Sequence, residues 1–148
     1  MTQFAAFLRG VNVGGVTLTM AFKMADMATA LNDAGFAQVR TILASGNVLL
    51  ESASGVATVR EKAEAALRES FGYDARVFAY DIDTVRAIDA AYPFEREVDG
   101  HHSYVWIVYW QVPKGATLDS TIGKTMGKPR YKSSTTTRNL RTLAKMLH

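Results

Sequence analysis

Arginine, asparagine and glycine residues near the start of this 148-residue sequence have the types and spacing of an anion-binding loop. An apolar run ends at Arg9, and Asn12, Gly14 and Gly15 follow within a few positions. Backbone N–H groups of a glycine-containing loop bind anions, and a guanidinium binds a carboxylate or phosphate through paired hydrogen bonds. The loop has neither the spacing of a P-loop nor that of a dinucleotide-binding motif. It therefore predicts an anion site without specifying the anion.

Two further polar clusters are candidates for the same binding surface. Ser45 and Asn47 lie on either side of a glycine between two β-like segments, and Thr137, Arg138 and Asn139 precede a helical segment near the end of the chain. A helix N-terminus favours anions because its first N–H groups are free and its dipole is positive there. We therefore predict ligand-binding roles for these five residues as well.

A purely structural role is the alternative for the same clusters. Asparagine in loops, here Asn12 and Asn47, commonly satisfies the backbone of a turn. Arg9 can also pair with a carboxylate such as Glu51 or Asp26. Both interpretations stay open at the level of the sequence.

Hydrophobic periodicity assigns an alternating order of strands and helices to residues 1–80. The predicted order is strand, helix, strand, strand, helix, strand, with the strands at residues 4–8, 39–43, 47–51 and 76–80. This is the split βαβ, or ferredoxin-like, order. Since each right-handed crossover leaves room for one strand, the sheet order is predicted to be four, one, three, two.

This predicted sheet places two of the polar clusters at one rim. In an antiparallel pair of strands one and three, the end of the first lies beside the start of the third. Arg9 leaves the first strand where Ser45 and Asn47 enter the third. We therefore expect a binding site formed by the loop after the first strand and the turn between the second and third.

Residues 81–148 are predicted to form a second, smaller α+β half, after a boundary at residue 80. Its expected elements are a helix capped by Asp81 or Asp83, one strand from Ser103 to Val112, a short helix before Gly127, a basic loop from Lys128 to Ser134, and a final helix capped by Thr137. The whole chain is thus predicted to be α+β.

The net charge of +3 is unevenly distributed along the chain. From Pro113 onward eight lysine and arginine residues accompany a single acid, Asp119, so this segment carries about +7 and the first 112 residues about −4. A basic segment with an embedded aromatic residue, here Tyr131, is typical of nucleic-acid binding. We therefore weigh three functions: binding of a nucleotide or phosphorylated metabolite, binding of RNA or DNA, and a non-catalytic scaffold role as a homodimer through the 103–112 strand.

Composition excludes several classes of protein. The sequence contains no cysteine, which excludes disulfides, thiolate catalysis and cysteine-ligated metals. It has no apolar run near the roughly 20 residues that span a bilayer and no signal-peptide pattern, so we expect a cytoplasmic protein without a membrane partner. Asp99, His101 and His102 lack the spacing of metal ligands, and no metal site is predicted. Ser45 has no evident histidine and acid partners, so enzymatic activity and cofactors stay unassigned.

Several segments together resemble the bacterial domain-of-unknown-function 1697 (DUF1697) family. They are Phe7 to Gly15, Met24 to Met27 with Gly35-Phe36, Val39 to Thr41 through Ser45 to Val48, Pro93-Phe94, and Thr137 to Asn139. The resemblance implies an α+β protein with a ferredoxin-like first half, and it places the family's characteristic polar residues at the predicted clusters. It also implies a further strand pair before the closing helix, for which this chain is some 30 residues too short, so the resemblance implies that the second half is an incomplete α+β half. The family brings no established activity.

Overall fold

The computed structural model describes residues 1–9, 24–43, 46–72, 74–105, 109–126, 128–132 and 136–148. These residues form two compact units, Met1–Arg86 and Ala87–His148, which we describe separately. The division follows Arg86, a few residues beyond the boundary that the sequence predicts. Within the described ranges, no helix combines the length and apolar character that crossing a bilayer requires.

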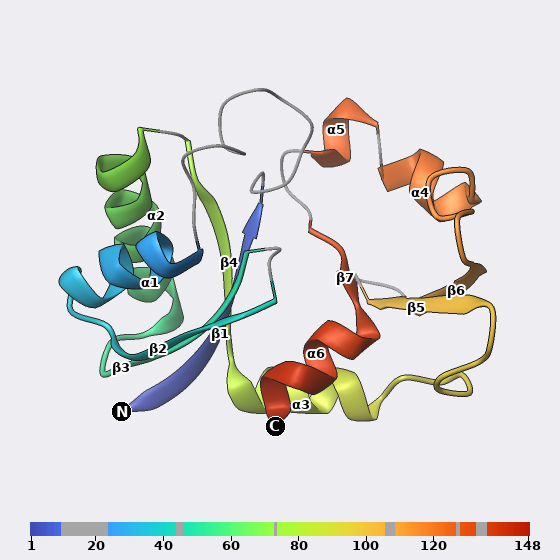
Figure 1. The fold of residues 1–148 in the computed structure, drawn as a ribbon, viewed down its shortest axis with the longest axis horizontal. Helices are drawn as coiled ribbons and strands as arrows, with labels where there is room; N and C mark the ends of the chain where they lie inside the picture. The colour runs from blue at the N-terminus through green and yellow to red at the C-terminus, as the bar shows by residue number, and fades with distance from the viewer. Residues whose placement is uncertain (10–23, 44–45, 73, 106–108, 127, 133–135) are drawn as a thin grey trace. The chain divides into compact units, whose positions relative to one another are not determined.

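The first unit is a four-stranded antiparallel sheet with two helices, and its elements follow the predicted order (Figure 1). They are β1 Thr2–Arg9, α1 Met24–Asp33, β2 Ala37–Ile42, β3 Asn47–Ser52, α2 Val56–Phe71 and β4 Arg76–Asp81. The strand order in the sheet is β2-β3-β1-β4, which confirms the order derived from the handedness of the crossovers. The chain is therefore a mixed α+β protein, as predicted.

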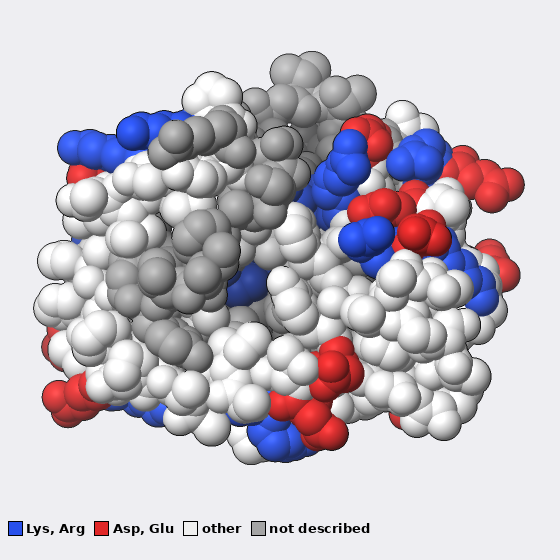
Figure 2. Space-filling model, turned by 180° about the vertical axis from the view of Figure 1, so that it is seen from behind, with Lys and Arg blue, Asp and Glu red and all other residues white. Residues whose placement is uncertain are grey.

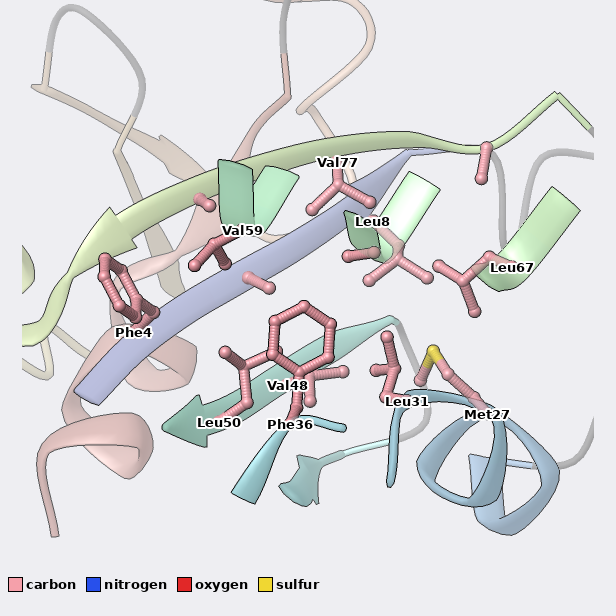
Figure 3. Packing of buried hydrophobic residues seen from close by; sticks show 14 residues of the cluster. Phe4, Leu8, Met27, Leu31, Phe36, Val48, Leu50, Val59, Leu67 and Val77 are labelled. Carbon is pink, nitrogen blue, oxygen red and sulfur yellow. The ribbon is translucent and has the colours of Figure 1, made fainter. Parts of the chain in front are cut away.

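The core of this unit lies between the sheet and the two helices (Figure 3). Phe4 and Leu8 of β1 alternate with residues of the opposite face and belong to one buried cluster with Met27 of α1 and Leu67 of α2. Successive side chains of a strand point to opposite faces. The remaining side chains of β1, including Arg9, therefore point away from the helices.

Two glycines in turns of the first unit have the backbone conformation that glycine favours. Gly35 follows α1 with φ +84°, and Gly46 precedes β3 with φ +73°, both in the left-handed region. The Gly46 carbonyl also accepts a hydrogen bond of 2.7 Å from the backbone N–H of Leu8. This bond fixes the end of β1 against the start of β3.

The second unit contains a three-stranded antiparallel sheet of order β6-β5-β7 within its described residues. Its elements, with the helix that crosses from the first unit, are α3 Ile82–Ala90, β5 His101–Val105, β6 Tyr109–Pro113, α4 Thr121–Met126, α5 Pro129–Lys132, β7 Arg138–Asn139 and α6 Leu140–Leu147. The last strand of this sheet, β7, is only two residues long.

The predicted strand and the predicted basic loop of this unit both differ from the structure. The segment predicted as one strand, Ser103 to Val112, belongs to two antiparallel strands in which Val105 lies opposite Tyr109. The three residues between them are Trp, Ile and Val, so the sequence has no turn former to indicate the reversal. The predicted basic loop contains the short helix α5, which begins at Pro129, because proline is favoured in the first turn of a helix.

Asp81, one of the two residues predicted as the cap, is the residue that caps α3. Its carboxylate accepts hydrogen bonds of 2.8 Å from the backbone N–H and from the hydroxyl of Thr84. These bonds hold the pKa of Asp81 below its ordinary value of 3.8, since they favour the charged carboxylate. The stabilisation by this cap is therefore present above pH 3.8 and is lost as the pH falls through the lower pKa of the folded chain.

We expect Asp81→Asn to remove this pH dependence while keeping the cap. The asparagine oxygen still accepts from the Thr84 N–H but does not titrate. Denaturant unfolding at several pH values below 5 measures the difference in stability between the two proteins. The excess in free energy of unfolding of the wild type over Asp81→Asn should shrink as the pH falls. Stabilities of the two proteins that change in parallel with pH would contradict the role of Asp81 as a titrating cap.

We expect Asn47→Ala to lower the free energy of unfolding by about 1–3 kcal/mol, because it removes a buried donor from the Ile42 carbonyl. The Asn47 side chain is fully buried, and its Nδ2 donates to that carbonyl at 3.1 Å. The matched control is Asn32→Ala, at an exposed position of α1, which should change stability by less than about 0.5 kcal/mol. Equal denaturant midpoints for Asn47→Ala and wild type would contradict a stabilising role of the hydrogen bond from Asn47 to Ile42.

Candidate functional site

The cross-strand register places two arginines side by side at one end of the first sheet. Arg9, the last residue of β1, lies directly opposite Arg76, the first residue of β4. Cross-strand partners have Cα atoms about 4.5–5.5 Å apart and side chains on the same face. Val77, the neighbour of Arg76, is buried in the core beneath the helices. Both arginines therefore project from the face that α1 and α2 leave free.

Arg9 has no counter-charge within the described residues. No described acid, and neither Glu51 nor Asp26 in particular, forms an ion pair with it. The side chain is half-buried at the end of the strand. The structural ion pair that was the alternative role for Arg9 is thus not observed among these residues.

Arg76 shares its acid with a third arginine. The Arg76 guanidinium lies 3.5 Å from one oxygen of Asp74, and Arg68 at the end of α2 lies 3.4 Å from the other oxygen. All three of these side chains are more than half exposed, so the two pairs are weak in water. Three arginines and two carboxylates, those of Asp74 and of Glu64 on the Val77 N–H, therefore lie at or beside this end of the sheet, which leaves a local excess of positive charge among the described residues.

Asn47 lies near Arg9 as predicted, but its observed bond is structural. Its partner across the strands is Phe7, two residues before Arg9, so Asn47 and Arg9 belong to the same sheet face. The Asn47 amide donates to Ile42, which braces the β2–β3 turn. Asn12, Gly14, Gly15 and Ser45 lie outside the described residues, and their predicted binding roles stay predictions.

Thr137, Arg138 and Asn139 belong to the second unit, where Asn139 rather than Thr137 caps α6. The Asn139 side chain accepts from the backbone N–H of Arg141 at 2.9 Å. The prediction of Thr137 as the cap is wrong because the helix begins two residues later, at Leu140. One of the helix's first N–H groups is therefore already satisfied by a side chain of the protein itself.

The Arg138 guanidinium is directed to neighbouring oxygens of the protein. It donates to the hydroxyl of Thr136 and to the carbonyl of Thr137, the latter at 2.9 Å. Burial lowers the pKa of Arg138 to about 10, since desolvation disfavours the charged form. These contacts are those of a guanidinium that holds the β7 segment in place.

The acidic and basic side chains that line a pocket of the second unit already pair with each other. Its lining includes Glu97, His101, Ser103, Asn139 and Arg141. Arg141 donates from Nε to one oxygen of Glu97 at 3.1 Å and from a terminal nitrogen to the other. The bonds from Arg141 lower the pKa of Glu97, and those to Glu97 raise the pKa of Arg141. This pocket therefore offers no surplus charge comparable with that at Arg9.

Sequence reasoning missed Arg76, although the information was present. The predicted strand order already placed the first residue of the fourth strand beside the last residue of the first. The predicted site used only the pairing of strands one and three, which are the strands next to the glycine turn. The position of Arg68 could not be predicted in this way, because its contact with Asp74 depends on where α2 ends relative to β4.

The surface charge of the described residues is mixed. On the face of the molecule in Figure 2, basic and acidic side chains are interspersed, and the described part of that face shows no continuous basic surface. Phe7, on the face of β1 that points away from α1 and α2, is only 5% exposed, which leaves little of its ring for stacking on a base. Among described residues, no three His, Asp or Glu side chains are grouped as metal ligands.

Comparison with known proteins agrees with this fold. The structure of the conserved bacterial protein SP0830 from Streptococcus pneumoniae is similar to this chain with a TM-score of 0.75, at 19% sequence identity and over 99% of each chain. No curated protein matches the sequence. The family model described as "Protein of unknown function (DUF1697)" matches residues 1–136. The chain therefore belongs to the DUF1697 family, as its motifs predicted.

Proposed function

We propose that this protein binds a small phosphorylated anion at the end of the first sheet, between Arg9 and Arg76. The observation that carries the proposal is the direct cross-strand register of these two arginines, with no ion pair to Arg9 among the described residues. Like charges directly opposite each other in a sheet are destabilising. A bound dianion offsets this repulsion, because it interacts favourably with both guanidinium groups.

The chemistry of the two side chains favours a phosphate over a simple halide. A guanidinium has a planar set of donors that matches two oxygens of a phosphate or carboxylate. Two guanidinium groups on adjacent strands therefore contact up to four oxygen positions of one or two phosphoryl groups. Asp74 does not neutralise the pair, since its carboxylate also contacts Arg68.

The residues that follow Arg9 support the same ligand class from sequence. Asn12, Gly14 and Gly15 belong to the glycine-containing loop, whose N–H groups are the type that cradles phosphates. The alternatives of a nucleic-acid module and a homodimeric scaffold gain no comparable support from the described contacts. The proposal is therefore one of binding, with no reaction assigned.

Isothermal titration calorimetry with inorganic pyrophosphate at low salt tests this proposal. We expect Arg9→Gln and Arg76→Gln each to weaken binding on the order of 10- to 150-fold, which corresponds to the loss of one hydrogen bond to a charged group. Added salt should also weaken binding to the wild-type protein, since the interaction is between charges near the surface.

Arg40→Gln is the matched control, because Arg40 is exposed on β2, two strands from β1 in the same sheet. Its affinity for pyrophosphate should equal that of wild type, and all variants should melt at similar temperatures. The proposal is overturned if the wild-type protein binds neither pyrophosphate nor phosphate, or if all three substitutions have the same effect.

A further inference from the structure

We infer that the anion at Arg9 and Arg76 is the phosphate of a nucleoside monophosphate whose base stacks on Phe78 and Tyr80. This inference rests on the proposed function and adds the chemical class of the ligand. Its basis is the sequence of side chains on the face of β4 that points away from α1 and α2. From the start of the strand, Arg76, Phe78 and Tyr80 alternate with Val77 and Ala79, which are buried in the core.

The exposure of the two aromatic side chains allows a base to reach them. Tyr80 is 40% exposed, and Phe78 is half-buried. The ring of Tyr80 lies 6.2 Å from that of Phe7 at an angle of 55°, and Phe7 is itself buried. Because Phe7 supports it from β1, Tyr80 presents an aromatic surface that needs little reorganisation on binding.

The spacing along β4 matches the dimensions of the ligand. Residues two apart on one strand are separated by about 6.6 Å, from a rise of roughly 3.3 Å per residue. This is comparable with the separation of phosphate and base in a nucleoside monophosphate. A phosphate held by Arg9 and Arg76 therefore places the base over Phe78, with its outer edge toward Tyr80.

One backbone donor on the edge of β4 is unavailable to an incoming peptide strand. The backbone N–H of Val77 donates to the Glu64 carboxylate of α2 at 2.9 Å, so this donor is already used. An incoming strand needs such edge donors for main-chain pairing. The part of β4 that offers exposed surface to a ligand is its side chains Arg76 and Tyr80, so a compact aromatic anion fits it better than an extended peptide that needs the edge donors.

Calorimetric titration of adenosine 5′-monophosphate (AMP) and ribose 5-phosphate tests the inference. Both ligands carry the same phosphate and sugar, and only AMP carries a base. We expect AMP to bind the wild-type protein on the order of 5- to 150-fold more tightly, the range found for stacking one base on an aromatic side chain. Tyr80→Leu and Phe78→Leu should each reduce this ratio and leave the affinity for ribose 5-phosphate unchanged.

Phe94→Leu is the control, since Phe94 is an aromatic residue of the second unit with 47% exposure. Its AMP to ribose 5-phosphate ratio should equal that of wild type. Equal affinities for the two ligands, both lost in Arg76→Gln, would overturn the base contact and leave the anion site intact. If neither ligand binds while pyrophosphate still does, this inference is overturned and the anion site stands; if pyrophosphate does not bind either, both proposals are overturned. If a short single-stranded RNA binds more tightly than AMP and Tyr80→Leu weakens that binding, the ligand of this site is a nucleic acid and not a free nucleotide, which overturns the inference.

Discussion

The pairing of β1 with a strand on each side is the constraint on which the rest of the first unit depends. Because β1 is hydrogen-bonded to both β3 and β4, its register fixes the position of every neighbouring side chain. Phe4 and Leu8 fill the core under the helices, while Arg9 is left on the other face opposite Arg76. A slip of one residue would exchange the two faces and bury the guanidinium. The core and the candidate site are therefore determined by the same register.

The sequence was sufficient for those parts of the fold that follow from local chirality and turn chemistry. Handedness of the crossovers led to the correct strand order, and Gly46 has the positive φ that its place in the turn predicts. The same reasoning brought Arg9 and Asn47 to one end of the sheet. It did not predict that the Asn47 amide would bond to Ile42, since the choice between ligand and backbone depends on burial, which is set by packing.

Other features depend on choices among residues that are nearly equivalent in sequence. Both Thr137 and Asn139 are good helix caps, and only the position of Leu140 in the second unit decides between them. Ser52 and Ser54 precede α2 as suitable caps, but the cap position is Gly55 and no side chain bonds there. The reversal between Val105 and Tyr109 falls among β-forming residues without a turn signal. In each case tertiary packing overrides a local preference.

The surplus of positive charge at the end of the first sheet is tested most directly by nuclear magnetic resonance of the arginine side chains. The Nε–H signals of the arginines are followed while pyrophosphate is added at low salt. We expect the Arg9 and Arg76 signals to move together along one saturating curve, while the Arg40 signal stays in place. Movement of all arginine signals in proportion to ionic strength, or a saturating shift confined to the arginines of the second unit, would contradict it.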